Sequence, residues 1–122
     1  MKTIFVVDDN VVNLITAEKS LSDSYNVFTL DSASNMFDLL NNIKPDLILL
    51  DLMMPVIDGF EALKKLKSDE QHAKIPVVFL TSKNDADTKA LGFEMGISDF
   101  ISKPFSETAL HDCINTHLQG DK

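Results

Sequence analysis

The chain has 122 residues, of which 44% are hydrophobic and 25% charged, and its formal net charge is −8. It has the size of one domain, and such an acidic surface repels phosphate backbones, so we expect no direct binding of nucleic acid. No apolar run reaches the length of a membrane span, the start lacks a signal peptide, and Cys113 is the single cysteine. We therefore expect a cytoplasmic protein without an intrachain disulfide.

Short apolar runs and segments with helical spacing of apolar residues alternate along the whole chain. In chain order they predict a strand at 4–7, a helix at 11–21, a strand at 25–30, a helix reaching 43, a strand at 47–50, a helix opening at 58, a strand at 77–80, a helix at 85–95, a strand at 99–102 and a helix after 106 that reaches 118. The helix at 11–21 is predicted to present Val11, Leu14, Ile15, Ala17 and Leu21 as its apolar face.

Particular residue types mark several helix ends. Asp58 with Glu61 three residues later resembles a capping box, and Ser106 is a good N-cap. Gly96 closes the helix at 85–95. Gly92 lies inside that helix and costs about 1 kcal/mol relative to Ala, so we expect the helix to be locally less stable than the others.

Five alternations of strand and helix are the signature of an α/β fold with a parallel sheet covered by helices on both faces. We expect a single domain over residues 1–122 with a flavodoxin-like, doubly wound (βα)5 architecture. The expected strand order is 2-1-3-4-5, in which the first and third strands are neighbours.

Polar side chains follow four of the five predicted strands. Asp8 and Asp9 end the first strand, Asp51 the third, Thr81 the fourth and Lys103 the fifth. In open α/β sheets, ligands bind outside the carboxyl ends of the strands, at the point where the strand order reverses. The predicted order therefore brings three acids, a hydroxyl and an ammonium group to one edge of the sheet.

Three neighbouring carboxylates need a cation. Two of them about 4 Å apart repel each other by about 4 kcal/mol at an effective dielectric constant near 20. Lys103 supplies one positive charge, and a divalent ion with oxygen ligands, most simply Mg²⁺, would balance the remainder. The alternative is that one acid is protonated, or that Lys103 pairs with a single aspartate.

This set of groups suits phosphoryl transfer. Asp51 can act as the nucleophile and form an aspartyl phosphate, while Mg²⁺ and Lys103 neutralise charge on the transferring group and Thr81 donates to one of its oxygens. The chain has no glycine-rich phosphate loop, so the donor is expected to be another protein or a small acyl phosphate.

Four motifs resemble the receiver domain of response regulators in two-component signalling. They are V-V-D-D-N at 6–10, L-D-L-M-M-P-V-I-D-G at 50–59, L-T-S at 80–82 and F-I-S-K-P-F at 100–105. The resemblance extends from Ile4 to about Leu118, and the combination at these spacings is highly specific.

The resemblance implies a role for each acidic residue of the predicted edge. Asp51 would be the phosphoacceptor, and Asp8 and Asp9 would form the acidic metal pocket. Asp9, Asp51 and the backbone carbonyl of Met53 would bind Mg²⁺, with Asp8 acting more often through water.

The resemblance also implies a regulatory switch rather than an enzyme, one that catalyses only its own phosphorylation and dephosphorylation. Lys103 would contact the phosphoryl group, and the peptide bond between Lys103 and Pro104 would be cis. Thr81 and Phe100 would move together when phosphate arrives, and change the surface formed by 85–95, 99–102 and the last helix. That surface would control an output domain or a downstream protein, or would form a homodimer. The donor would be a sensor histidine kinase or a histidine phosphotransfer protein.

Three other functions are alternatives to a phosphorylation switch. An aspartate-nucleophile phosphatase of the haloacid dehalogenase type would place a D-x-D motif after the first strand, where this chain has adjacent Asp8 and Asp9. A flavodoxin would need a phosphate loop at the same place. A degenerate receiver that only binds proteins would lack part of the acidic and basic set.

The remaining reactive side chains are predicted to be unremarkable. Cys113 lacks neighbours in the sequence that would activate it and is expected to be a packing residue. His111 and His117 lie six residues apart on different faces of the last helix, so they are poor metal ligands together.

Overall fold

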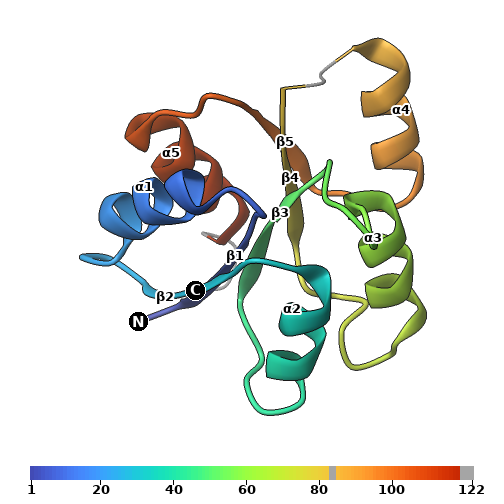
Figure 1. Cartoon of the computed structure of the whole chain (residues 1–122), viewed down its shortest axis with the longest axis horizontal. Helices are drawn as coiled ribbons and strands as arrows, with labels where there is room; N and C mark the ends of the chain where they lie inside the picture. The colour runs from blue at the N-terminus through green and yellow to red at the C-terminus, as the bar shows by residue number, and fades with distance from the viewer. Residues whose placement is uncertain (83–84, 119–122) are drawn as a thin grey trace.

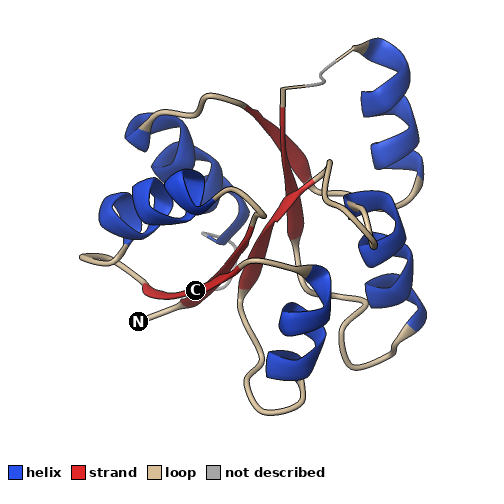
Figure 2. Cartoon of the chain, viewed as in Figure 1, coloured by secondary structure: helices blue, strands red, loops and turns tan. Residues whose placement is uncertain are grey.

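Residues 1–82 and 85–118 are described by the computed structural model, which forms one parallel sheet between two layers of helices (Figures 1 and 2). The elements are β1 (Thr3–Val7), α1 (Val11–Leu21), β2 (Asn26–Leu30), α2 (Ala33–Leu40), β3 (Leu47–Asp51), α3 (Gly59–Ser68), β4 (Val77–Thr81), α4 (Ala86–Glu94), β5 (Asp99–Ser102) and α5 (Glu107–Leu118). The strand order is β2-β1-β3-β4-β5, which confirms the predicted flavodoxin-like topology. Across the described ranges, no helix combines the length and the apolar character that crossing a membrane requires.

Successive residues of each strand face opposite layers of helices. The side chains that pack toward α1 and α5 are Ile4, Val6, Leu47, Leu49, Val78, Leu80 and Ile101. Those that pack toward the layer of α2, α3 and α4 are Phe5, Val7, Ile48, Leu50, Val77 and Phe79 (Figure 1). A strand covered on both faces buries every residue, which is why the central strands read as continuous apolar runs in the sequence.

The register of the strands brings the ends of β1, β3, β4 and β5 to the same level. Val7 pairs with Leu50, so Asp8 follows beside Asp51. Asp51 in turn pairs with Leu80, and Thr81 pairs with Ser102. All four strands are parallel, so the polar residues at their carboxyl ends share one edge of the sheet.

The predicted helix caps are present. The N–H of Glu61 donates to Oδ1 of Asp58 at 2.9 Å, and the Glu61 side chain accepts from the N–H of Asp58 at 3.4 Å. Together these bonds form the predicted capping box of α3. Ser106 accepts from the N–H of Ala109 at 3.0 Å and so caps α5, and Gly96 closes α4 with a φ of 98°.

Helix α2 is shorter than predicted. It ends at Leu40, although the N–H of Ile43 still donates to the carbonyl of Leu39 at 2.9 Å. Asn41 and Asn42 are poor helix formers, so the chain leaves the helix before it reaches Pro45. The apolar spacing up to Ile43 was correct, but it describes an irregular last turn rather than a helix.

The apolar face predicted for α1 is too wide. Only Leu14, Ala17 and Leu21 of that set are buried, whereas Val11 is 64% and Ile15 is 49% exposed. The first turn of α1 begins four positions after the last residue of β1, so it lies next to the carboxyl edge of the strands. Two apolar side chains therefore remain on the surface beside the carboxyl edge of the strands.

Amide hydrogen exchange is expected to be faster in α4 than in α1. Of the residues of α4 only Thr88 and Gly92 are buried, whereas α1 buries three apolar side chains. Helices with few buried apolar contacts open at a lower free energy, and an interior glycine lowers it further. Exchange followed by mass spectrometry tests this prediction, and equal protection of the two helices would contradict it.

Candidate functional site

A pocket of about 380 Å³ opens at the carboxyl edge of the sheet. It is lined by residues that follow β1, β3, β4 and β5: Asp8, Asp9, Asn10, Asn13, Asp51, Met53, Thr81, Ser82, Lys103 and Pro104. The structure therefore brings the three acids, the hydroxyl and the ammonium group predicted from the sequence into one cavity. The peptide bond between Lys103 and Pro104 is cis.

Lys103 joins two of the three acids. Its Nζ lies 2.8 Å from Oδ2 of Asp8 and 2.9 Å from Oδ1 of Asp51. The side chain of Asp8 is fully buried and that of Asp51 is 3% exposed, while Lys103 is 18% exposed. One ammonium group thus compensates two carboxylates that water hardly reaches, and Asp9 is exposed at the mouth of the pocket.

Hydrogen bonds from residues nearby in the sequence hold both buried carboxylates in place. The N–H of Asn10 donates to Oδ1 of Asp8 at 2.9 Å, and Nδ2 of Asn13 donates to Oδ2 of Asp8 at 3.1 Å. The N–H of Met53 donates to Oδ1 of Asp51 at 3.2 Å. Asn13 was not among the predicted site residues. Its place on the first turn of α1, five residues after Asp8, is the signal that could have identified it.

Burial and charged neighbours shift the pKa values of Asp51 and Lys103. Burial raises the pKa of Asp51 to about 6, and the neighbouring Asp8 and Asp9 act in the same direction while Lys103 opposes them. Burial alone would lower the pKa of Lys103, but its hydrogen bonds to Asp8 and Asp51 outweigh burial and raise it. Near neutral pH, Lys103 is therefore charged, and Asp51, whose pKa lies below that pH, is mostly ionised.

In the presence of a chelator, Asp51→Asn is expected to raise the free energy of unfolding near pH 8. This gain should shrink as the pH falls through about 6 towards 4. In the folded wild type Asp51 takes up a proton near pH 6, whereas in the unfolded chain it does so near the ordinary value of 3.8. The wild type is therefore stabilised relative to the variant as the pH falls between these two values. Urea unfolding at a series of pH values measures the difference, and a difference independent of pH would contradict the raised pKa. The exposed Asp38→Asn is the control.

Thr81 and Phe100 occupy adjoining but distinct environments. Thr81 is 1% exposed and lines the pocket at the end of β4. Phe100, on β5, is half-buried between Phe79 of the core and Phe93 of α4, with ring centroids 5.7 and 5.4 Å away. A Cβ atom on Gly92 would lie 2.6 Å from Cζ of Phe100, so the glycine that interrupts α4 makes room for this ring.

The oxygen atoms of the pocket are suited to a hard divalent cation. Asp8, Asp9 and Asp51 each offer a carboxylate oxygen, and these atoms all lie within 4.8 Å of one another. A set made only of oxygen atoms, open to water on the side of Asp9, fits Mg²⁺ better than a transition metal. Met53, whose side chain is 63% exposed, also lines the pocket.

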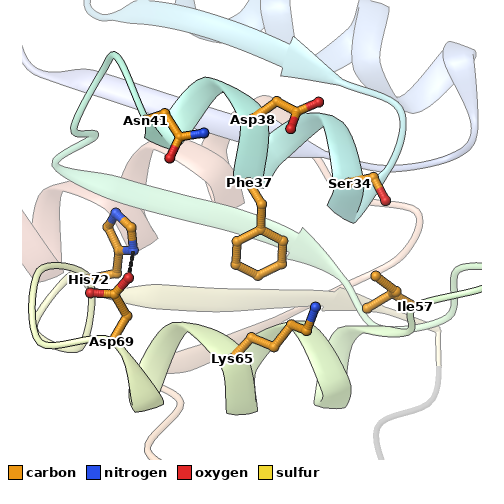
Figure 3. A pocket seen from close by; sticks show the side chains of 8 residues that line it. All are labelled: Ser34, Phe37, Asp38, Asn41, Ile57, Lys65, Asp69 and His72. Carbon is orange, nitrogen blue, oxygen red and sulfur yellow. Dashed lines mark ion pairs between the residues drawn. The ribbon is translucent and has the colours of Figure 1, made fainter.

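A larger pocket, of about 470 Å³, lies between α2 and α3 and shares no lining residue with the pocket at the carboxyl edge (Figure 3). It contains the Lys65 ammonium, 5.5 Å from the centre of the Phe37 ring, and the ion pair of His72 with Asp69 at 3.2 Å. Its charged groups are exposed or paired with each other, and no buried side-chain nitrogen or oxygen atom among the described residues lacks a hydrogen-bond partner. Volume alone therefore does not identify the functional site, and the convergence of strand ends does.

Comparisons with known proteins agree with this geometry. A family model described as the response regulator receiver domain matches residues 4–115. Protein PilH of Pseudomonas aeruginosa is 31% identical, with 98% of this chain and 100% of that protein covered. The crystal structure of the chemotaxis protein CheY4 of Vibrio cholerae has a TM-score of 0.92 at 26% identity and covers 97% of this chain and 99% of that one.

Other relatives are longer. A probable cyclic di-GMP phosphodiesterase of Vibrio cholerae is 34% identical over 98% of this chain, which spans 27% of that protein. In two further curated relatives the chain spans 56% and 54% of the length. The matched region thus occurs both as most of a protein and as one part of a larger protein.

Proposed function

This chain belongs to the response regulator receiver domain family of two-component signalling, and from that premise we propose that residues 1–122 form one receiver domain that is switched by phosphorylation of Asp51. The single observation that carries the proposal is the position of Lys103, whose Nζ contacts both Asp8 and Asp51 in the pocket. Membership of this family argues against the phosphatase and flavodoxin alternatives. The phosphodiesterase name belongs to a longer protein and is not transferred.

The carboxylate of Asp51 is the nucleophile. Lys103 and the N–H of Met53 both donate to Oδ1, and we assign Oδ2, which receives neither bond, as the attacking oxygen. A bond forms between Oδ2 and phosphorus as the bond between phosphorus and the donor nitrogen breaks, and the imidazole of the donor keeps or takes up a proton. Lys103 and the Thr81 hydroxyl, which line the same pocket, would stabilise the phosphoryl oxygens.

Asp8, Asp9, Asp51 and the backbone carbonyl of Met53 would hold Mg²⁺. When bound, this ion supplies positive charge to the carboxylates and to the phosphoryl group. Before binding, Lys103 is the cation that contacts the buried Asp8 and Asp51 among the described residues, and the pKa of Asp51 is raised by burial to about 6. Competition between the proton and the ion is therefore expected to weaken binding of Mg²⁺ below that pH.

The donor is a protein, either a sensor histidine kinase or a histidine phosphotransfer protein. Three apolar side chains next to the pocket support this proposal: Val11, Val12 and Ile15 of α1 are 64%, 63% and 49% exposed. They follow Asn10, which lines the pocket, so a protein that covers them would bring its phosphohistidine to Asp51.

Phosphorylation is read out through Thr81 and Phe100. Drawing the Thr81 hydroxyl towards the phosphoryl group would open space next to β5, into which the Phe100 ring turns. The ring now packs against Gly92 and Phe93 of α4, so its movement would change the α4–β5–α5 surface. This surface is the proposed contact with an output domain, a downstream protein or a second copy of the chain.

Acetyl phosphate with Mg²⁺ is expected to add one phosphoryl group to the wild type and none to Asp51→Asn. Intact-protein mass spectrometry measures the product, and lability to hydroxylamine identifies an acyl phosphate. Asp38→Asn, an exposed aspartate far from the pocket, is the control and should be modified like the wild type. Equal modification of Asp51→Asn would remove Asp51 from its role, and no modification of the wild type by acetyl phosphate or by a phosphohistidine donor would indicate a degenerate receiver.

A further inference from the structure

A second group of metal-ligating side chains lies at the opposite edge of the sheet from Asp51. Asp99 begins β5, and Cys113 and His117 lie four residues apart on one face of α5. A carboxylate oxygen, Sγ and an imidazole nitrogen from these residues lie within 4.8 Å of one another. We propose that Asp99, Cys113 and His117 bind Zn²⁺ or a similar transition-metal ion.

Both measured distances are close to those of a tetrahedral zinc site. Bonds of about 2.3 Å to sulfur and about 2.1 Å to nitrogen and oxygen place sulfur about 3.6 Å from oxygen, and nitrogen about 3.4 Å from oxygen. Here Sγ of Cys113 is 3.7 Å and Nε2 of His117 is 3.0 Å from Oδ2 of Asp99. Small side-chain rotations are therefore enough to place all three atoms around one ion.

The surroundings orient the ligands and leave room for the ion. The other oxygen of Asp99, Oδ1, accepts the N–H of Phe100 at 2.8 Å, which directs Oδ2 towards α5. Within residues 1–82 and 85–118, His117 is the one ion-pair partner of Asp99, so no lysine occupies the position of the cation. The side chains of His117 and Asp99 are 22% and 44% exposed, which gives an ion access from solvent.

Charge and proton balance are simple. As the metal–sulfur bond forms, the S–H bond of Cys113 breaks and its proton passes to solvent. The lone pair of Nε2 of neutral His117 and the carboxylate of Asp99 complete three protein ligands, and a water molecule takes the fourth position. Two negative ligands neutralise a divalent ion, and a set of sulfur, nitrogen and oxygen suits Zn²⁺ rather than Mg²⁺.

Such an ion would link α5 to the start of β5, next to Phe100. Asp99 is adjacent to Phe100 in the chain, and Cys113 and His117 lie on the helix of the proposed output surface. This site shares no ligand with the Asp51 pocket. Metal binding can therefore be measured on the unphosphorylated protein, and the two proposals can fail separately.

Co²⁺ is the probe, added to the full chain in saturating Mg²⁺ so that the carboxylate pocket is occupied. One equivalent is expected to produce a thiolate-to-cobalt charge-transfer absorption, which only Cys113 can supply. Cys113→Ser should abolish this band, and Asp99→Asn and His117→Gln should each weaken binding at least about tenfold. His111→Gln, on the same helix but outside the cluster, should bind like the wild type.

Thiol protection gives a second readout that needs no variant. Zn²⁺ is expected to slow alkylation of the single thiol in the folded wild type, and a chelator should restore the rate. Absence of both the band and the protection would overturn the proposal. So would cobalt binding that is unchanged in both Asp99→Asn and His117→Gln, since Cys113 would then bind the ion without the other two residues.

Discussion

Lys103→Met is expected to lower the free energy of unfolding by about 3 kcal/mol near pH 8 in the metal-free protein. The substitution keeps an unbranched side chain only one atom shorter but leaves Asp8 and Asp51, at 0% and 3% exposure, without the ammonium group that lies within 2.9 Å of each. Removing one partner of a buried ion pair costs more than the pair contributes, because the remaining charges cannot be hydrated. Urea unfolding monitored by circular dichroism measures the loss.

Two comparisons separate this effect from a general loss of packing. The exposed Lys64→Met on α3 should change stability little. In Lys103→Met, the cost should shrink when Asp51→Asn is combined with it, because one of the two uncompensated charges is then absent. If the two substitutions are simply additive, Lys103 does not stabilise the protein through Asp51. Lys103→Met alone should accept a phosphoryl group from acetyl phosphate more slowly than the wild type.

Gly59→Ala is expected to destabilise the protein by about 2–3 kcal/mol, although alanine favours a helix by about 1 kcal/mol over glycine. Gly59 is the buried first residue of α3. A Cβ atom there would lie 2.7 Å from Cα of Leu52 and 2.8 Å from the carbonyl oxygen of Asp51. Both are backbone atoms, so the start of α3 or the end of β3 must move.

Gly92→Ala provides the matched comparison for Gly59→Ala. The closest atom to its added Cβ would be Cζ of Phe100 at 2.6 Å, the far end of a half-buried side chain that can turn away. Together with the helix preference of alanine, this should keep the change below about 1 kcal/mol. Thermal or urea unfolding of the two variants tests the contrast, and equal losses would show that backbone contact at Gly59 is not the cause.

The Cys113 thiol shows how sequence and structure differ in what they reveal. Burial and the neighbouring Asp99 raise its pKa to about 12, which agrees with the expectation that it is no nucleophile. However, its sequence neighbours did not show that it meets Asp99 and His117. His117 was judged as a metal ligand only with His111, whose Nε2 instead lies 2.6 Å from the carbonyl oxygen of Ser20.

The sequence by itself determined the alternation of strands and helices, the doubly buried strands, the caps at Asp58 and Ser106, and the polar residues at the strand ends. These features depend on periods of two and 3.6 residues and on hydrogen bonds between residues near one another in the chain, so a short window contains them. The five alternations also predicted a flavodoxin-like architecture and with it the strand order.

Only the tertiary structure decided the contacts that depend on distant parts of the chain. Lys103 and Asp51 are separated by 52 positions, and the register of the strands is what brings Nζ within 2.9 Å of the carboxylate. The sequence shows only that Gly92 weakens α4, whereas in the structure the ring of Phe100 occupies the space that a Cβ would fill. Val11 and Ile15 fit the helical period but are 64% and 49% exposed, because burial depends on neighbours in space and not on spacing along the chain.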